Sequence, residues 1–302
     1  MNRFFLLTLS LFFPLSMMGQ LPFQKTDVKD VMKKVADWQI AHQKDVKHGA
    51  LDWTNAALYM GMLDWAELAE TEMGDASYYD WLVKLGRRYG WQPDKRMYHA
   101  DDIAVGQVFI DLYNKYKDKN MLYPTQARAE WVVNHPSDGP MDLDYKKRET
   151  LERWTWCDAL YMAPPVYVKL YMLTGDKRFI KFMNKEYKAT YDLLFDKDER
   201  LFYRDSRYLT QKEANGAKVF WGRGNGWVLG GLAEMLQDFP KNDKNRKFYE
   251  ELFVTLSARV AELQSADGFW HASMLDPASY PSPETSATGF IVYALAYGVN
   301  EG

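Results

Sequence analysis

The chain has 302 residues, and its 38 Lys and Arg against 41 Asp and Glu give a formal net charge of −3. This length allows one large domain or two ordinary ones. The balanced charge, without a block of one sign, argues against a nucleic acid or an anionic membrane surface as partner. Aromatic residues reach 16 %, with 11 Trp and 20 Tyr. A large helical core accounts for most of them, and the excess also suits a cleft that binds sugar rings.

Residues 1–20 are predicted to be a signal peptide. Arg3 supplies a positive charge, residues 4–18 are almost wholly apolar, and Gly19 offers a small residue for cleavage. The apolar run is short for a membrane-spanning helix, and no Cys follows it to carry a lipid anchor. We expect export to the periplasm or out of the cell, no membrane contact after cleavage, and a monomer in which residues 21–302 form one domain.

Past residue 26, apolar residues recur at spacings of three and four, which is typical of helices. Gly or Asn ends several of these segments and an Asp opens the next, as at Asp118 and Asp176. Repeated helix pairs predict either an open solenoid or a closed ring. The ten predicted segments are residues 27–43, 54–72, 76–90, 102–117, 124–134, 157–174, 177–194, 227–239, 245–264 and 284–299.

Two longer connections, residues 135–153 and 195–220, suit loops gathered at one mouth of a ring. The second contains Leu201-Phe202-Tyr203 and runs into Lys218-Val219-Phe220-Trp221, which we expect to pair as a short hairpin. No change of composition separates two domains. The sequence therefore predicts an all-α fold with a short hairpin insertion.

Asp158 lies in the run Trp154-Thr155-Trp156-Cys157-Asp158 and is followed by Pro164 and Pro165. Trp154 and Trp156 offer flat faces that can stack on sugar rings. A carboxylate among aromatic rings loses solvation, which raises its pKa toward values useful for proton transfer. The alternative is a helix N-cap beside core tryptophans, and the residues favour neither interpretation over the other.

A second acidic site follows His99, where Asp101 and Asp102 open a helical segment. Acidic residues at a helix start complement its dipole and cap free amides, which is a purely structural role. If the pair faces Asp158 across a cavity, repulsion between like charges would instead hold a proton at neutral pH and supply an acid.

The run Trp221-Gly222-Arg223-Gly224-Asn225-Gly226-Trp227 is the third candidate. Its glycines could let backbone and guanidinium approach a ligand, and Arg223 could grip a carboxylate with two hydrogen bonds. A glycine-rich turn with an ion-paired arginine is the alternative. A nucleotide loop is excluded by the lack of a preceding strand and of a phosphate-binding Lys.

No metal or other cofactor is expected. The five His show no ligand spacing, and Cys157 is the only cysteine, so neither a zinc site nor an internal disulfide is predicted. A nucleophilic serine in a Gly-x-Ser-x-Gly elbow is also absent from the sequence.

Together these motifs resemble glycoside hydrolase family 105, the unsaturated rhamnogalacturonyl hydrolases, and more distantly the family 88 unsaturated glucuronyl hydrolases. The resemblance implies an (α/α)6 barrel for residues 21–302. Such a barrel has twelve helices where ten are readable, so we expect the chain to lack the last helix pair and to be incomplete at its C-terminus. The motifs that carry the resemblance are Asp101-Asp102-Ile103-Ala104-Val105-Gly106-Gln107, residues 156–165, residues 220–227 and Glu284-Thr285-Ser286.

The resemblance also implies a chemistry, in which a 4,5-unsaturated uronate at the non-reducing end of a lyase-generated oligosaccharide is hydrated at its C4–C5 double bond. Asp158 would be the general acid and base, with Asp101 or Asp102 as its partner and Asp101 favoured by alignment. The remaining residues would bind substrate: Arg223 and Trp227 the uronate, with Trp154, Trp156, His99 and Arg204 lining the pocket.

Two departures concern the sugar that follows the uronate. Arg204 stands where characterised members often have a His, and Lys146-Lys147-Arg148 stands where they often have Trp-His-Lys. Pectin or rhamnogalacturonan is the expected source, and uronates from ulvan, arabinogalactan or glycosaminoglycans stay open. So do a catalytically inactive carbohydrate-binding ring and an ordinary glycosidase or lyase on the same fold.

Overall fold

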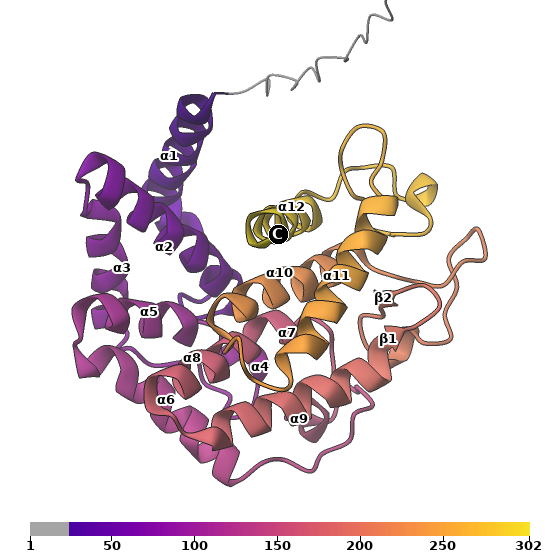
Figure 1. Cartoon of the computed structure of the whole chain (residues 1–302), viewed down its shortest axis with the longest axis horizontal. Helices are drawn as coiled ribbons and strands as arrows, with labels where there is room; N and C mark the ends of the chain where they lie inside the picture. The colour runs from indigo at the N-terminus through magenta and orange to yellow at the C-terminus, as the bar shows by residue number, and fades with distance from the viewer. Residues whose placement is uncertain (1–23) are drawn as a thin grey trace, which may run out of the picture. The chain divides into compact units, whose positions relative to one another are not determined.

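The computed structural model describes residues 24–302 (Figure 1). The predicted signal peptide, residues 1–20, lies outside the described residues. The described chain divides into two units, one ending at Asp45 and the other running from Val46 to Gly302. The first unit consists of helix α1 (Lys25–His42) and a short 3-10 turn (Gln43–Asp45).

The second unit is built from helices. Two of them, α4 and α7, are single turns that directly precede α5 and α8. With α1, the long helices within residues 24–302 number ten and correspond to the ten predicted segments, which confirms the all-α prediction. Another helix pair beyond residue 302 stays a prediction. The elements are α2 (Trp53–Met73), α3 (Ser77–Arg88), α4 (Ala100–Ile103), α5 (Gly106–Tyr116), α6 (Lys119–Asn134), α7 (Ala159–Met162), α8 (Pro164–Thr174), α9 (Lys177–Leu194), α10 (Gly222–Asp238), α11 (Arg246–Glu262) and α12 (Thr285–Glu301).

Within this unit the helices form two layers, as in an α/α barrel. The inner helices α2, α5, α8, α10 and α12 each contact the next one in the chain, while α3, α6, α9 and α11 each pack outside the inner helix that precedes them (Figure 1). The inner helix α10 is buried along almost its whole length. Within residues 24–302, no helix combines the length and apolar character that crossing a membrane requires.

Local sequence explains where the helices begin and break. Asp118 and Asp176 cap α6 and α9 as predicted, each accepting the backbone N–H two residues on, at 3.0 and 2.9 Å. The predicted segment 157–174 is interrupted at Ala163, because Pro164 has no N–H to continue a helix and instead opens α8.

A short hairpin is present, but the partner strand predicted for Leu201-Phe202-Tyr203 is wrong. β2 (Leu201–Phe202) pairs antiparallel with β1 (Phe195–Asp196), directly before it in the chain, and not with residues 218–221. Trp221 instead forms an isolated bridge with Ser273. A tight local turn closes a smaller loop than the predicted pairing, which costs less chain entropy.

Close helix packing brings the first turns of the inner helices together. A Cβ at Gly231 of α10 would lie 2.4 Å from the Leu160 carbonyl oxygen of α7, and one at Gly226 would lie 3.3 Å from the Ala287 Cα of α12. The approach at Gly231 is possible only for glycine, and a Cβ at Gly226 would make a contact tighter than most real ones. These close approaches fix α7 and α12 against α10, and with them the residues at their N-terminal ends.

Candidate active site

Charged residues gather where the inner helices begin. Asp52 caps α2, Asp101 lies in α4, Asp158 directly precedes α7, Arg223 lies in the first turn of α10, and Glu284 caps α12. The negative charges of Asp158 and Asp52 both act on Asp101, and Arg223 acts on Asp158. The three sequence motifs therefore meet at one end of the second unit.

Asp158 is buried and does not cap the helix that it precedes. Its Oδ2 accepts a hydrogen bond from the Cys157 thiol at 3.4 Å. Burial raises the pKa of the Asp158 carboxyl, and the nearby positive charge of Arg204 opposes that rise. With no capping role, the carboxylate is free for a ligand, which favours the catalytic interpretation over the N-cap.

Asp101 is the carboxylate that faces Asp158. Burial and then the negative charge of Asp158 raise the pKa of Asp101 to about 8. Its Oδ1 is buried and has no hydrogen-bond partner. Two coupled carboxyls titrate as a pair, so the pair keeps a proton at neutral pH.

Asp102 has a different environment, and its candidacy as a catalytic residue is corrected. Its Oδ2 accepts the backbone N–H of Arg96 at 2.7 Å, and its Oδ1 accepts the Arg96 Nε at 3.0 Å. The Asp102 carbonyl also accepts the backbone N–H of Asp94 at 2.8 Å. Asp102 thus holds the loop before α4 in place, and Arg96 neutralises its charge.

His99 caps α4 as a neutral ring. Its Nδ1 accepts the backbone N–H of Asp101 at 3.3 Å, which leaves the ring proton on Nε2. Burial and the positive charge of Arg96 lower the pKa of His99 to about 4. The Trp156 ring lies 4.7 Å from the His99 ring and is itself buried. His99 adjoins Asp101, Trp156 adjoins His99, and contact of either residue with a substrate stays a prediction.

Two other tryptophans belong to the core, which corrects their predicted role in stacking on sugar. Trp154 is 2 % exposed, and the edge of its ring packs against Phe182 of α9 at 5.9 Å. Trp227 is also 2 % exposed, with Phe290 at 4.1 Å and Tyr161 at 4.8 Å from its ring. Protein rings therefore cover the faces that a sugar would need.

Arg223 is held from two sides. Its Nη1 donates to Glu284 Oε1 at 2.8 Å, and its guanidinium lies 4.2 Å over the Trp221 ring. Its Nε is buried without a partner. The ion-paired alternative is therefore confirmed, and the grip on a ligand carboxylate stays a prediction, for which the arginine keeps donor capacity beside Asp158.

The glycines beside Arg223 do not form a ligand loop, contrary to the prediction. Helix α10 already begins at Gly222, where a Cβ would lie 2.2 Å from the His271 carbonyl oxygen. A Cβ at Gly224 would lie 3.0 Å from the Cys157 Sγ. These positions are small because protein, and not a ligand, approaches them.

Arg204 comes from the segment after β2 and carries contacts that the sequence did not reveal. Its Nη2 donates to the Tyr145 hydroxyl at 2.8 Å and its Nη1 to Asp205 Oδ2 at 2.6 Å. Its guanidinium lies 5.7 Å from the Trp221 ring. Tyr145 and Asp205 lie in the two long connections, so the expectation that these loops meet at one mouth is confirmed.

A cavity of about 360 Å³ is lined by Arg204, Trp221 and Arg223 together with Tyr208 and Tyr280, and its two arginines are those whose charges act on Asp158. It combines two guanidinium groups, several aromatic rings and a proton-bearing carboxyl pair next to them. Such a site can hold an anionic, ring-shaped ligand and transfer a proton to it.

Comparisons with known proteins agree with this geometry. A family model described as Glycosyl Hydrolase Family 88 matches residues 31–302. The chain is similar to an unsaturated 3S-rhamnoglycuronyl hydrolase of Formosa agariphila, with 37 % identity over 296 residues, 95 % of this chain and 77 % of that protein. A solved structure described as a polysaccharide lyase aligns with a TM-score of 0.81 and 31 % identity, covering 92 % of this chain and 78 % of the other. A glycosyl hydrolase family 88 structure from Bacteroides vulgatus aligns with a TM-score of 0.77 and 25 % identity, covering 91 % and 80 %.

Proposed function

This chain belongs to glycosyl hydrolase family 88, and on that premise we propose that it removes a 4,5-unsaturated uronic acid from the non-reducing end of oligosaccharides. The printed name of the Formosa relative, an unsaturated rhamnoglycuronyl hydrolase, supports this activity. The observation that carries the proposal is the coupled pair Asp101 and Asp158 beside two arginines. The pair supplies a proton, and the arginines supply the charge that a uronate carboxylate needs.

Asp158 acts as the general acid in the first step. It transfers its proton to C4 of the unsaturated ring, and the electrons of the C4–C5 double bond form the new C–H bond. The positive charge that develops at C5 is shared with the ring oxygen. The pair keeps one proton at neutral pH, and for the transfer this proton is on Asp158, whose pKa burial raises, while the negative charge lies on Asp101.

Water completes the reaction at C5. Its oxygen bonds to C5, and its proton passes to the Asp158 carboxylate, so the acid is regenerated. The resulting hemiketal opens and the glycosidic bond is lost. One carboxylate thus serves as acid and base in turn, and the spacing rules for ordinary two-carboxylate glycosidases do not apply.

Arg223 and Arg204 hold the uronate carboxylate during these steps. Both guanidinium groups lie over Trp221 and both act on the charge of Asp158. A carboxylate placed between them receives charge-assisted hydrogen bonds, which orient C4 toward Asp158. Arg223 contributes its unpaired Nε to this grip.

The sugar that follows the uronate is rhamnose in this proposal. The name of the Formosa relative supports a rhamnose-linked uronate, at 37 % identity over 296 residues. A pectin-derived rhamnogalacturonan fragment, as expected from the sequence, carries the same linkage class and is tested beside fragments from ulvan. The cavity lined by Arg204 and Tyr208 is where this next sugar lies.

The test is the ultraviolet absorbance of the C4–C5 double bond. Purified protein is mixed with lyase digests of rhamnogalacturonan, ulvan and glycosaminoglycans, and absorbance is followed with Asp158→Asn as control. Hydration removes the double bond, so we expect absorbance to fall and a free uronate-derived product to appear by mass spectrometry.

The same measurement separates the rival activities. A lyase creates a double bond, so on undigested polysaccharide it would raise the absorbance. An ordinary glycosidase would release sugar with no change in absorbance. A flat trace with every digest, and no product, would refute the proposed function.

We also propose that the chain is exported, on the basis of the sequence of residues 1–20. Expression of the full chain with a C-terminal tag, followed by fractionation and N-terminal mass analysis, tests this. A protein that retains Met1 and stays in the cytoplasm would contradict export.

A further inference from the structure

Asp205 is a fully buried carboxylate with two arginines on it. Its Oδ2 accepts Arg204 Nη1 at 2.6 Å and Arg207 Nη2 at 2.9 Å, while its Oδ1 accepts Arg207 Nε at 2.8 Å. The residue is 0 % exposed. Burying an ionised carboxylate costs free energy unless it is paired. Here Arg204 and Arg207 pair with Asp205 and offset that cost.

The segment that carries Asp205 is attached to the segment that carries Asp158. Trp156 and Asp205 form an antiparallel bridge, and the Cys157 N–H donates to the Arg204 carbonyl at 2.8 Å. The two backbones therefore run side by side just before the candidate general acid. A shift of Asp205 would move Arg204 relative to Asp158.

A second support reaches Arg204 from the other long connection. Its Nη2 donates to the Tyr145 hydroxyl at 2.8 Å, and Arg207 lies 4.4 Å over the Tyr145 ring. Asp205 thus binds both arginines, and Tyr145 contacts both of them. The guanidinium of Arg204 is fixed at two nitrogens, which leaves it one orientation over Trp221.

We propose that Asp205 and Tyr145 are positioning residues, which act on the reaction only by holding the Arg204 guanidinium beside Asp158 and in the substrate cavity. This inference rests on the proposed function. It assigns no contact with substrate to either residue. Arg204 touches the substrate, and the other two determine where Arg204 is.

The chain contains a matched control for Asp205. Asp176 also caps a turn by accepting the N–H of the residue two positions on, and it also pairs with that arginine, Arg178, through Nε and Nη2. It caps α9, and no second arginine binds it among the described contacts in residues 24–302. Asp176→Asn therefore removes the charge of the same kind of arginine pair, while the amide oxygen can still cap the turn, and it does not touch Arg204.

The test is a double-mutant cycle in the full chain, with kcat/KM measured by loss of double-bond absorbance. We expect Asp205→Asn to lower kcat/KM by roughly 10- to 100-fold, and Tyr145→Phe by roughly 3- to 10-fold, because a misplaced binding group is costly. In an Arg204→Ala background, each change should lower kcat/KM by less than about twofold, because its effect passes through Arg204. Asp176→Asn should stay within about twofold of its parent in both backgrounds.

A structural role alone would give a different pattern. Asp205→Asn would then reduce activity by the same factor with and without Arg204, and such additivity overturns the inference. If Asp205→Asn does not fold, as judged by circular dichroism, Tyr145→Phe decides, because Tyr145 is 50 % exposed and its loss leaves the core intact. Additive behaviour of Tyr145→Phe is equally a refutation.

The outcome also separates this inference from the proposed function. A wild-type protein that leaves the absorbance of every digest unchanged overturns both. An active wild-type protein with an additive cycle overturns only the positioning roles.

Discussion

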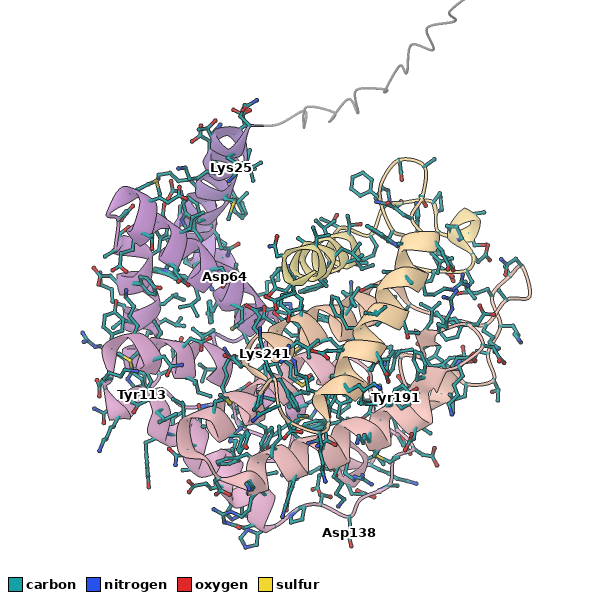
Figure 2. The ribbon with its side chains drawn as sticks, in the orientation of Figure 1. Lys25, Asp64, Tyr113, Asp138, Tyr191 and Lys241 are labelled. Carbon is teal, nitrogen blue, oxygen red and sulfur yellow. The ribbon has the colours of Figure 1, made fainter. Side chains whose placement is uncertain are left out.

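Two regions along the inner helices contain buried carboxylates, and they differ in how many hydrogen-bond and ion-pair partners those carboxylates have. At the N-terminal ends lie Asp101 and Asp158, and Arg204 and Arg223, whose charges act on Asp158, line a cavity of about 360 Å³. Farther along the same helices lies a second polar cavity of about 440 Å³, lined by Asp111, Lys169 and Glu234 together with Asp64 of α2, which is labelled in Figure 2. Both ends contain carboxyls whose pKa burial raises.

At the second cavity, neighbouring side chains bind Asp111, Asp238 and Glu234. Lys169 Nζ lies 2.9 Å from Asp111 Oδ1 and 2.8 Å from Asp238 Oδ2. Glu234 Oε1 accepts the Tyr293 hydroxyl at 2.7 Å, while burial raises the pKa of Glu234 to about 7. These groups tie α5, α8, α10 and α12 together. Their hydrogen-bonding capacity is used within the protein.

At the N-terminal ends the carboxylates have fewer hydrogen-bond partners. Asp101 Oδ1 is buried without a partner, and the donors to the Asp158 carboxylate are the Cys157 thiol at 3.4 Å and its own backbone N–H. A raised pKa is therefore common to both ends and does not identify a reactive site by itself. The unmet hydrogen-bonding capacity next to unpaired guanidinium donors is what distinguishes the first end.

The largest expected effect contrasts Asp158 with Glu234. Asp158→Asn keeps the shape but cannot carry a proton, so kcat should fall by more than about 10³-fold, since one residue has both acid and base roles. Glu234→Gln should leave kcat within about threefold. Steady-state kinetics on the best digest measures both. If Asp158→Asn kept more than about a tenth of the activity, the mechanism would have to move to Asp101.

The second prediction concerns stability at the other cavity. Lys169→Met removes the cation shared by Asp111 and Asp238, and leaves two carboxylates close together. We expect the free energy of unfolding to fall by about 2–3 kcal/mol, with kcat unchanged at a temperature where the variant is folded. Urea unfolding measures the change. A comparable loss of kcat in folded protein would mean that the two ends are coupled.

The third prediction separates binding from chemistry. Arg223→Ala should raise KM by about 10- to 100-fold with a smaller change in kcat, because the grip on the uronate carboxylate exists before and during the reaction. Arg223→Lys should recover only part of this loss, since a single ammonium cannot form two parallel hydrogen bonds. A loss confined to kcat would assign Arg223 to the transition state alone.

The fourth prediction is a pH dependence at both ends. The pKa of Asp101 is about 8, so the pair keeps its proton below that pH, and kcat should fall as pH rises through about 8. Glu234→Gln should leave this alkaline limb in place. A limb that survives in Asp101→Asn at the same pH would belong to another group.

The free energy of unfolding should also depend on these titrations. It should fall with rising pH through Asp101 and through Glu234 alike, because burial raises the pKa of both carboxyls. Between about pH 4 and pH 8 the unfolded carboxyl of Asp101 is ionised and the folded one is protonated, so folding loses free energy as pH rises. Asp101→Asn should therefore gain a few °C in Tm across this range and level off above it. For Glu234→Gln the gain should level off near pH 7.

Periodicity predicted the helices because it depends on neighbours three and four residues apart. It could not predict which of Asp101 and Asp102 faces Asp158, since adjacent helical residues point about 100° apart and the phase is set by packing. Trp154 and Trp227 looked like sugar platforms for a similar reason. Phe182 and Phe290, which cover them, are remote in sequence.

One part of the site, the pairing of Asp205 with Arg207, has a local sequence pattern. Asp205 and Arg207 repeat the Asp-x-Arg pattern of Asp176 and Arg178, which identifies a cap with its own ion pair. The sequence could not show that Arg204 completes a second pair on the same carboxylate. That pairing depends on Tyr145, which reaches the site from a different loop.

The contacts of Gly222 and Gly224 have a consequence for how this site can change. A Cβ at Gly222 would collide with the His271 backbone, and one at Gly224 would lie 3.0 Å from the Cys157 thiol, so the helix end that carries Arg223 packs tightly against the residue before Asp158. New substrate preferences can hardly arise by remodelling these helices. They have to arise in the loops, where Tyr208, Val219 and Tyr280 line the cavity. Among homologues, we expect the chemistry to be inherited with the helices and the choice of sugar to diverge with the loops.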